Sequence, residues 1–294
     1  MRERDVVQAD FSGAQSVDRA LRLLTLIGRH GDIGMPLSRI VEESKLNKPT
    51  ARRLVMALMR AGLVSQDPET RRYFLGEETY VLGTLAARRY GIHQLAMGNL
   101  VRIAEVSEES AFLSVRRDTW SVCLHREEGA YPIRTHILNA GDRYPLGLGA
   151  GSLALLAALD DDDADAVIEA NRQVVAERYP RFPYDDLRAT LALTRERGYA
   201  VNPGLILPSS WGIGVAVMGP DGRPAGALSI AAIASRLPED RQPVLALLLQ
   251  REARLLEAKL ANQTDPAGGP RRAQRRASAE PPAAKTRQKI SIGR

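Results

Sequence analysis

The stretch that decides the fold is MPLSRIVEESKLNKPTARRLVMALMRAG at residues 35–62, in which two amphipathic segments are separated by a break. The first segment places apolar side chains on one helix face, at Leu37, Ile40 and Val41. The second segment does the same at Leu54, Val55, Leu58 and Met59. Spacings of three and four residues are typical of amphipathic helices, so the pattern predicts two short helices, the first of about two turns.

The break between these helices has the chemistry of a tight turn. Asn47 is placed as the N-cap of the second helix, and Pro49 falls in its first turn, where a missing N–H costs nothing. The apolar stripe leaves the polar N-terminal end of this helix exposed, as in a helix-turn-helix that offers this end to DNA bases. The residues expected to face DNA are Ser38, Lys48, Pro49, Thr50, Arg52 and Arg53.

Helix pairs with a polar N-terminus also occur in ordinary helical domains, so this segment alone leaves a purely structural role open. The residues directly after the second helix favour DNA binding. Residues 63–65 and 72–75 read as short strands, and turn-forming residues at 66–71 join them. A β-hairpin directly after a recognition helix is a wing, whose Arg71 and Arg72 can reach phosphate or the minor groove. Residues 15–76 are therefore expected to form a winged helix-turn-helix.

Length and composition agree with a protein of two domains. The 294 residues can hold two cores, and no window approaches the ~18 consecutive apolar residues of a membrane span. The first residues lack the apolar core of a secretory signal. Cys123 is the only cysteine, which excludes an intramolecular disulfide and agrees with a reducing compartment. A cytoplasmic location without a membrane partner is expected.

The net charge of +6 is divided unevenly along the chain. Residues 265–294 hold eight Lys or Arg and two acidic residues, and therefore carry +6. Residues 15–92 hold thirteen basic and eight acidic groups, giving +5, whereas residues 93–264 hold eighteen and twenty-two, giving −4. A basic N-terminal part followed by an acidic one is expected when only one domain meets phosphate.

The chain divides into five segments. Helical spacing at 17–27 predicts a first helix with Ser16 as N-cap, which supplies core and a dimer contact. Residues 77–90 also follow helical spacing, with acids first and bases last, and are interpreted as a linker helix and dimer seam. The expected divisions are a mobile arm at 1–14, the winged helix-turn-helix at 15–76, the linker helix at 77–91, an effector-binding domain at 92–262 and a disordered basic tail at 263–294.

The segment 92–262 mixes helices with an antiparallel sheet. Short runs bounded by charges or glycine predict strands at 111–115, 120–126, 131–137, 215–218 and 225–233. Helical patterns occupy 92–106, 153–159, 165–171, 184–197 and 239–261, with an acidic turn at 160–163. Helices before, within and after an antiparallel sheet indicate an α+β fold. The tail lacks the apolar periodicity that a core needs, which predicts disorder.

A glycine-rich turn, YPLGLGAGS at residues 144–152, is the strongest candidate for ligand binding. It leads into a helix that is expected to begin near Ser152. Glycines let backbone N–H groups approach a ligand and a helix N-terminus favours an anion, so a small carboxylate could dock here. No Lys follows the glycines as in a P-loop, and no parallel strand precedes them as in a dinucleotide fingerprint. A glycine turn needed only for close packing is the alternative.

Signals for catalysis or metal binding are weak. The histidines at 30, 93, 125 and 136 are scattered, and no hydrolase, zinc-protease or paired-cysteine motif occurs. Cys123 and His125 are expected to share one face of a strand, but two ligands do not make a metal site. The acidic run at 160–163 lacks the alternation of a calcium loop and is interpreted as solvated. No cofactor, metal or catalytic residue is therefore predicted.

Several ordered segments resemble the IclR family of bacterial transcription regulators. They are SVDRALRLL at 16–24, LNKPTARRLVMALMRAGLV at 46–64, DPETRRYFLG at 67–76, GYAVN at 198–202 and DGRPAGALSIAAIASRL at 221–237. The resemblance implies a winged helix-turn-helix joined by a linker helix to a GAF-like effector domain, assembled as dimers or dimer-of-dimers tetramers. It also implies operator binding that a small metabolite controls, and leaves repression or activation open.

By the same resemblance, the effector pocket is expected at Leu146, Gly149, Ala150, Gly151, Asn202, Gly212, Ser229 and Ala231. The sequence departs from the family pattern at two of these positions, because many relatives have Cys where Gly212 stands and Ser where Ala231 stands. The loop at 203–211 is also unusually apolar. Fewer donors and more apolar surface favour an aromatic or other hydrophobic carboxylate over a small hydroxy acid.

Two other functions fit parts of the sequence. An enzyme could use the turn from Gly147 to Ser152 as an anion hole, but no base lies beside a nucleophile. The basic tail could bind RNA while the folded body only dimerises. The partners expected on the favoured interpretation are double-stranded operator DNA, a small-molecule effector and further copies of the chain.

Overall fold

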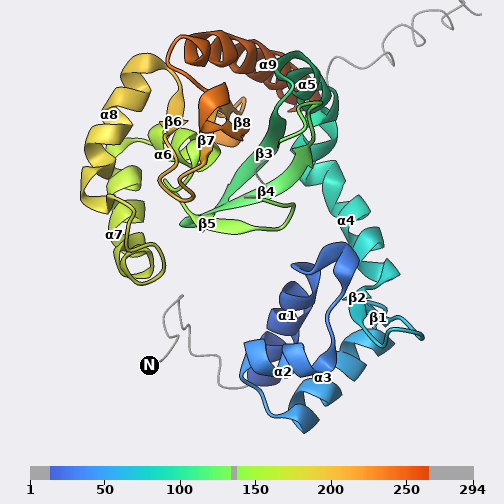
Figure 1. Ribbon diagram of the computed structural model, residues 1–294. Coiled ribbons are helices and arrows are strands. Elements are labelled where there is room, and N and C mark those ends of the chain that lie inside the picture. The colour runs from blue at the N-terminus through green and yellow to red at the C-terminus, as the bar shows by residue number, and fades with distance from the viewer. Residues whose placement is uncertain (1–13, 134–137, 265–294) are drawn as a thin grey trace, which may run out of the picture.

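The computed structural model describes residues 14–133 and 138–264, and a long helix joins its two parts (Figure 1). The N-terminal part holds α1 (Gln15–Gly28), the 3-10 turn η1 (Gly31–Ile33), α2 (Leu37–Ser44), α3 (Lys48–Arg60) and the hairpin of β1 (Val64–Gln66) and β2 (Tyr73–Leu75). The joining helix is α4 (Glu77–Tyr90), which coincides with the helical spacing at 77–90. This part is a winged helix-turn-helix, as predicted.

The N-terminal part is held together by a core to which its helices and both strands contribute. Leu23, Ile40, Val55 and Tyr73 are buried in it. The main chains of Met35 and Tyr73 exchange two hydrogen bonds of 2.9 Å, so β2 is attached to the segment that precedes α2. The hairpin is therefore fixed against the helices that it follows in sequence.

The second part is built on a six-stranded antiparallel sheet in the order β5-β4-β3-β8-β7-β6. Its strands are β3 (Ser110–Arg117), β4 (Trp120–Glu127), β5 (Arg143–Pro145), β6 (Ala200–Asn202), β7 (Ser210–Met218) and β8 (Pro224–Ile233). Its helices are α5 (Ile92–Ser107), α6 (Ala150–Ala157), α7 (Asp161–Arg178), α8 (Leu187–Arg197) and α9 (Arg241–Thr264), with the 3-10 turns η2 (Tyr184–Asp186) and η3 (Ala234–Arg236). The predicted α+β class is confirmed.

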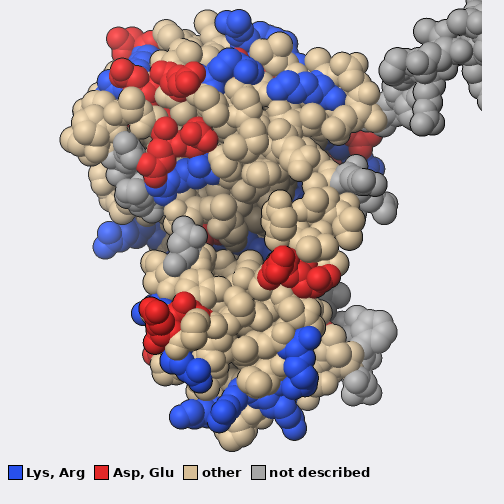
Figure 2. Space-filling view, turned by 90° about the vertical axis from the view of Figure 1, so that its right-hand side faces the viewer, with Lys and Arg blue, Asp and Glu red and all other residues tan. Residues whose placement is uncertain are grey.

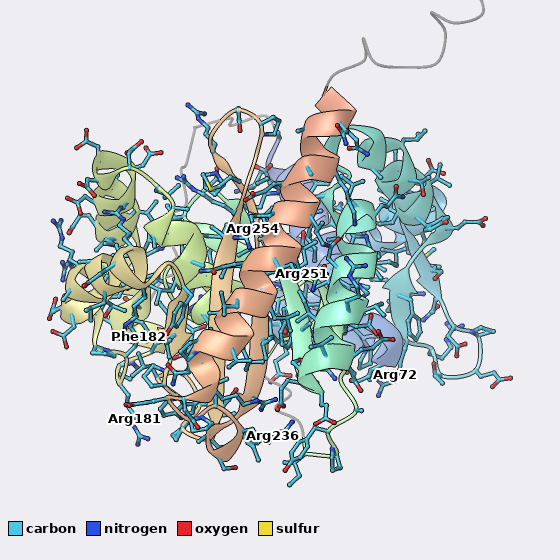
Figure 3. All side chains as sticks on the ribbon, turned by 90° about the horizontal axis from the view of Figure 1, so that it is seen from above. Arg72, Arg181, Phe182, Arg236, Arg251 and Arg254 are labelled. Atoms are coloured by element: carbon cyan, nitrogen blue, oxygen red, sulfur yellow. The ribbon has the colours of Figure 1, made fainter. Side chains whose placement is uncertain are left out.

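Helices cover both faces of this sheet. α5 and α9 lie side by side on one face, where Leu100, Leu228 and Leu249 are buried between helices and strands (Figure 3). α6 packs on the other face, with α7 and α8 outside it (Figure 1). Because strand side chains alternate between the two faces, β8 contributes to both cores, with Leu228 in the first and Ala227 in the second. The face under α6 is the one that meets the glycine-rich turn.

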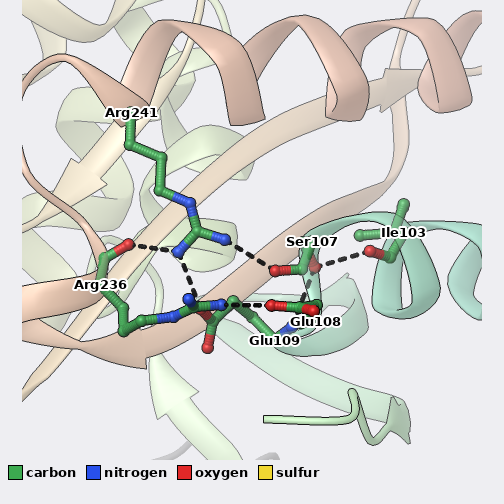
Figure 4. A network of polar contacts seen from close by, with 6 residues as sticks. All are labelled: Ile103, Ser107, Glu108, Glu109, Arg236 and Arg241. Atoms are coloured by element: carbon green, nitrogen blue, oxygen red, sulfur yellow. Dashed lines mark hydrogen bonds and ion pairs between the residues drawn. The ribbon is translucent and has the colours of Figure 1, made fainter.

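A buried carboxylate ties the two helices of the first layer to the sheet. Glu109, which is 3% exposed, accepts hydrogen bonds from Arg236 Nε at 2.6 Å and from Arg241 Nη1 at 2.8 Å. Arg241 Nη2 also donates to the carbonyl oxygen of Ser107 at 2.7 Å (Figure 4). A carboxylate can be buried when it is paired and hydrogen-bonded in this way. The network joins the end of α5 to the start of α9.

Three local predictions were wrong. α1 begins at Gln15 after Ala14, so Ser16 lies inside the helix and does not cap it. α6 begins at Ala150, earlier than expected, because Gly149 adopts a φ of +84° and ends the turn there. The acidic run is not a separate turn: Asp160 caps α7 by accepting a hydrogen bond from the Asp163 N–H at 2.8 Å, and the following acids fill the first helical turn. Acidic side chains there complement the helix dipole.

The strand expected at 131–137 does not form in its described residues, which are 131–133. β5, further along the chain, occupies the sheet edge beside β4 instead. The short strand β6 was not foreseen. The arm proposed at 1–14 lies outside the described residues except for its last residue, and α9 continues to Thr264, past the expected start of the tail. None of the helices within 14–133 and 138–264 is both long and apolar enough to cross a membrane.

Candidate functional site

The first candidate site is the N-terminal end of α3. Asn47 Oδ1 accepts a hydrogen bond from the Thr50 N–H at 2.9 Å, so the predicted N-cap forms. Pro49 occupies the first turn, as expected, because that turn needs no N–H donor from it. The cap fixes the direction in which α3 leaves the turn. It thereby sets where the polar side chains of the first turns point.

One face of α3 packs into the core and the other is open. Ala51, Leu54 and Val55 are buried, whereas Lys48, Pro49, Arg52 and Arg53 are exposed and Thr50 is half-buried. Ser38, in the first turn of α2, is exposed as well. Arg52 and Arg53 form no ion pair or hydrogen bond within residues 14–133 and 138–264. Figure 2 shows Lys and Arg side chains gathered over this end of the molecule.

The wing is built around one carboxylate. Asp67 Oδ1 accepts hydrogen bonds from the Thr70 N–H at 2.6 Å and from Thr70 Oγ1 at 2.7 Å, and these bonds lower the pKa of Asp67. Arg71 follows with a φ of +58° and an exposed side chain. Arg71 is thus presented at the tip, where a phosphate contact is sterically open.

Arg72 is placed differently from Arg71. Its Nη1 donates to the carbonyl oxygens of Ile33 at 3.1 Å and Gly34 at 3.0 Å, and its side chain is half-buried. The guanidinium therefore braces the wing against η1. The expected contact of Arg72 with DNA stays a prediction, but the structure gives this side chain a different partner.

The second candidate site is a cavity between the sheet and the start of α6. It encloses about 570 Å³ of empty space, its open mouth included. Seven of the eight residues expected to line the pocket do so: Gly149, Ala150, Gly151, Asn202, Gly212, Ser229 and Ala231. Leu146 does not, because it is fully buried in the core beneath α6, and Leu148 lines the cavity instead. Whether these residues bind an effector stays a prediction.

The N-terminus of α6 faces this cavity without a cap. Its N-cap residue Gly149 provides no side chain, and the N–H groups of Ala150 and Gly151 have no acceptor in the described part of the chain. Ser152 does not serve them, since its Oγ accepts from the Gly147 N–H at 3.0 Å and donates to the Pro145 carbonyl oxygen at 3.3 Å. A buried helix end whose N–H groups lack partners is an unusual arrangement. It is suited to an anion.

Glycines bring this helix end directly onto the sheet. A Cβ on Gly214 of β7 would lie 2.8 Å from the backbone of Ala150, and one on Gly151 would lie 2.9 Å from Ser229 Oγ. The alternative interpretation, that the glycine-rich turn is needed for close packing, thus applies to Gly151. The same packing holds the free N–H groups against the cavity, so the structural and ligand-binding interpretations are compatible.

The sequence did not identify several residues that line the cavity. Apolar walls come from Phe112, Ile206 and Trp211, and hydroxyls come from Ser114, Ser121 and Ser210. Alternation along β3 could have placed Phe112 and Ser114 on one face. Which face met the glycine-rich turn depended on the position of α6, and no local pattern contains that information.

The expectation that Cys123 and His125 share a strand face was wrong. The pairing of β3 with β4 shifts by one residue, so Cys123 lies opposite Ser114 and His125 lies opposite Leu113. Cys123 lines the cavity, where burial raises the pKa of its thiol to about 12. His125 Nδ1 lies 3.3 Å from Nε2 of His93 on α5. Among residues 14–133 and 138–264, no three side chains cluster as metal ligands.

These two sites occur on a chain that matches known regulators over nearly all of its described length. The family model of the IclR helix-turn-helix domain matches residues 16–68, and that of the bacterial transcriptional regulator IclR C-terminal domain matches residues 84–258. The chain therefore belongs to the IclR family of transcription regulators, with a DNA-binding and a ligand-binding part.

Individual relatives agree with this assignment. The HTH-type transcriptional regulator XynR of Escherichia coli is 25% identical over 76% of this chain and 88% of its own length. An IclR regulator from Alicyclobacillus acidocaldarius has a similar structure, with a TM-score of 0.69 at 26% identity over 83% of this chain and 98% of its own. A Microbacterium hydrocarbonoxydans IclR homologue, solved with 4-hydroxybenzoate, shares the fold at a TM-score of 0.67 and 21% identity over 84% of this chain and 99% of its own. The protein is a regulator and not an enzyme.

Proposed function

We propose that this regulator reads operator DNA with the N-terminal end of α3 and the tip of its wing, and that a carboxylate effector in the cavity controls this binding. On the DNA side, Lys48, Thr50, Arg52 and Arg53 enter the major groove, and Ser38 and Arg71 contact the phosphate backbone. Arginine side chains free of internal partners are suited to bidentate contact with guanine.

The main support for effector binding in the cavity is the pair of free N–H groups at the buried start of α6, those of Ala150 and Gly151. The described residues that line the cavity include no Lys, Arg, Asp, Glu or His. Helix N–H groups are therefore the positive end of the site, and they attract a single negative charge. Walls formed by Phe112, Ile206 and Trp211 favour an aromatic or otherwise apolar body on the carboxylate.

The ligand of a solved homologue supports this choice. The Microbacterium homologue that shares this fold was solved with 4-hydroxybenzoate, which is an aromatic carboxylate. In this chain Ile206 lines the cavity, and the N–H of the preceding Leu205 donates to Asn202 Oδ1 at 3.1 Å. Asn202 thus holds the loop that carries Ile206, and we assign it a role in shaping the apolar wall.

Control of DNA binding requires the effector to favour one arrangement of the two parts over another, since equal affinity for both would shift nothing. We propose that α4 transmits this preference, because it is the segment that connects the two parts. We also propose a homodimer, or a dimer of dimers, so that two α3 helices meet two half-sites of the operator.

The test places a bulky side chain in the cavity by substituting a residue of a strand. Ala231 of β8 lines the cavity, and Ala231→Trp occupies it without imposing backbone strain. Gly149→Trp is a poorer choice because Gly149 has a φ of +84°, which disfavours any side chain. Ala234→Trp, at an exposed position just beyond β8, adds the same ring outside the cavity and is the control.

Aromatic and aliphatic carboxylates are titrated against the three proteins, and both heat of binding and operator release are followed. The wild type and the control should bind a carboxylate and change their operator affinity, whereas Ala231→Trp should bind operator but not respond. Equal ligand binding by Ala231→Trp would place the effector elsewhere. Binding without any change in operator affinity would refute the control function.

A further inference from the structure

The outer side of α9, turned away from the sheet, carries a stripe of exposed residues. Val244 and Leu247 are each 64% exposed, and Leu255 is 44% exposed. Arg251 and Arg254 are exposed as well, and Figure 3 shows both on this helix. Steps of three and four residues connect these five positions, so they share one face of the helix. We call them the α9 stripe.

Both acidic residues of α9 are engaged on its other sides. Glu252 is buried and forms an ion pair with Arg102 of α5 at 2.6 Å. Glu257 accepts a hydrogen bond from the Met218 N–H of β7 at 2.7 Å. The exposed Glu105 of α5 is also directed to Arg102, whose pKa is raised by Glu252 and less strongly by Glu105. These carboxylates therefore balance other groups and not the charges of the stripe.

The remaining bases of α9 also have partners. Arg241 Nη1 donates to Glu109 at 2.8 Å, and Lys259 Nζ donates to Asn99 Oδ1 at 2.6 Å. The two arginines of the stripe differ from them, because neither forms an ion pair or hydrogen bond within residues 14–133 and 138–264. The stripe thus combines two unpaired positive charges with three exposed apolar side chains.

We propose that the α9 stripe docks an amphipathic helix of a partner protein, in which apolar residues are flanked by Asp or Glu. Grouped exposed apolar side chains mark interaction surfaces, and arginine is enriched at protein interfaces. Arginine binds carboxylates in a bidentate geometry. The stripe from Val244 to Leu255 is ~16 Å long, so a partner helix of about three turns covers it.

Charge distinguishes this occupant from others. A second copy that docked symmetrically would bring two Arg251 side chains together, because Arg251 lies at the centre of the stripe, and like charges oppose association. The segment 265–294 of the chain carries +6 and is repelled in the same way. DNA phosphates would pair with the arginines but would leave the valine and leucines without an apolar surface to contact. An acidic amphipathic helix satisfies both halves of the stripe.

The docking surface is separate from the two sites already described. α9 covers one face of the six-stranded sheet, whereas α6 and the cavity at its start lie on the other face. A partner on α9 therefore leaves the cavity and the N-terminal end of α3 open. This inference goes beyond operator and effector binding, and its failure would leave that proposal unaffected.

The probe is a fluorescent synthetic helix of about 15 residues, or four turns, that is hydrocarbon-stapled on its far side. It carries leucines along one face and glutamates beside them, and a matched peptide has lysine in place of every glutamate. Binding to the full chain is measured by fluorescence anisotropy. The wild type should bind the glutamate peptide about tenfold to a hundredfold more tightly, because charge-assisted hydrogen bonds form only with that peptide.

A charge-reversed variant gives a result that misfolding cannot produce. The double variant Arg251→Glu and Arg254→Glu should prefer the lysine peptide over the glutamate peptide. Leu247→Ser should weaken binding of both peptides, because each loses the same apolar contact. Arg181→Glu is the matched control, since Arg181 is exposed between α7 and α8 and has no partner in the described residues. It should keep the wild-type preference, and operator binding verifies the folding of every variant.

Four outcomes would overturn the inference. The wild type could bind both peptides equally or neither, or the double variant could retain the preference for glutamate, which would place the acidic helix elsewhere. Displacement of the glutamate peptide by random duplex DNA would assign the arginines to nucleic acid. Loss of self-association in Leu247→Ser, measured by sedimentation, would assign the stripe to a second copy of the chain.

Discussion

The arginines of α3 and the wing differ in what holds them, and that difference predicts separate roles. Arg52 and Arg53 extend from the second turn of α3 with no partner in the described residues, while Ala51, Leu54 and Val55 anchor the opposite face. A side chain without a partner in the protein breaks no intramolecular hydrogen bond or ion pair when it contacts DNA. Direct base contact is therefore assigned to these two residues first.

Arg52→Ala or Arg53→Ala should weaken operator binding by ~1–3 kcal/mol if the lost side chain is bidentate to guanine, and should relax the preference at one base pair. The measurement is binding to a library of single-base operator variants. Arg60→Ala is the control, because Arg60 is exposed at the far end of the same helix. Unchanged affinity in both variants would remove α3 from recognition.

Arg71→Ala and Arg72→Ala should have opposite signatures. Loss of the exposed Arg71 should weaken binding to all sequences alike and reduce the salt dependence, because fewer counterions are released. Loss of Arg72 removes two hydrogen bonds to the carbonyls of Ile33 and Gly34, and should lower the free energy of unfolding of this part by about 1–2 kcal/mol. Salt titrations and thermal unfolding distinguish them. A reduced salt slope without lost stability in Arg72→Ala would make Arg72 a phosphate contact.

The two arginines also show which single-residue features a sequence can predict. The Asn47 cap forms with a residue three positions away, so its chemistry is readable from neighbouring letters. The partners of Arg72 lie 38 and 39 positions earlier in the chain. In the sequence Arg72 looks equivalent to Arg71, because the contact of Arg72 with η1 exists only once the hairpin has folded against it. Ser114 and Ser121 were missed for the same reason, because they line the cavity only when α6, which is distant in sequence, packs on the sheet.

Strand β4 contacts both the cavity, through Cys123, and the first turn of α5, through His125. The one-residue shift in its pairing directs Cys123 into the cavity and His125 towards α5, where His93 follows directly after the junction with α4. His125 Nε2 in turn lies 3.2 Å from Glu127 Oε2. A period-two pattern predicts strands but not bulges, so this division of roles was not visible in the sequence. It places His125 beside His93 in the first turn of α5, close in sequence to the end of α4.

The histidine pair should make the second part sensitive to acid. Burial, and next the neighbouring His125, lower the pKa of His93 from its ordinary value of 6.5. A histidine whose pKa is lower in the folded state favours folding when neutral. This stabilisation is complete above pH 6.5 and is lost as the pH falls below 6.5 towards the lower, folded-state pKa.

His93→Gln keeps a neutral hydrogen-bonding side chain at all pH values and should remove part of this dependence. Thermal unfolding of wild type and variant is compared at pH 8, where both side chains are neutral, and at steps down to about pH 5.5, below the ordinary His pKa. The wild type should lose more stability on acidification than the variant. Parallel losses in the two proteins would show that the pair does not control acid sensitivity.

For the whole molecule, the part of the fold that local patterns could not supply is the order of the strands. The patterns predicted β3, β4 and β8, but the pairing of β3 with β8 joins residues more than a hundred positions apart. Binary pattern and turn chemistry identify elements, and they leave open which elements become neighbours. The resemblance to a known family provided the architecture, with a DNA-reading part and a ligand-binding part joined by one helix.

Apolar side chains on that helix remain exposed in the single chain. Tyr80 and Leu85 on α4 are 77% and 61% exposed, and Val17 and Leu21 on α1 are 56% and 50% exposed. Single exposed apolar residues are ordinary, but two helices that each carry several of them favour a second copy as the covering surface. In a two-fold dimer each contact occurs twice, so one substitution alters the interface at two places.

Leu85→Glu should therefore weaken self-association strongly. Losing the burial of one leucine costs ~1.5–3 kcal/mol, and the symmetric pair doubles this to ~3–6 kcal/mol, or about a hundredfold to ten-thousandfold in the dimer dissociation constant. Leu193→Glu, at a leucine of α8 that is 47% exposed, is the matched control. Sedimentation analysis over a concentration series should show monomers only for Leu85→Glu.

Because two linked α3 helices bind two half-sites more tightly than one, the affinity of Leu85→Glu for a full operator should fall while its affinity for an isolated half-site is retained. A Leu85→Glu protein that stays dimeric would place the dimer contact away from α4, and a monomer with undiminished affinity for the full operator would refute recognition by paired half-sites.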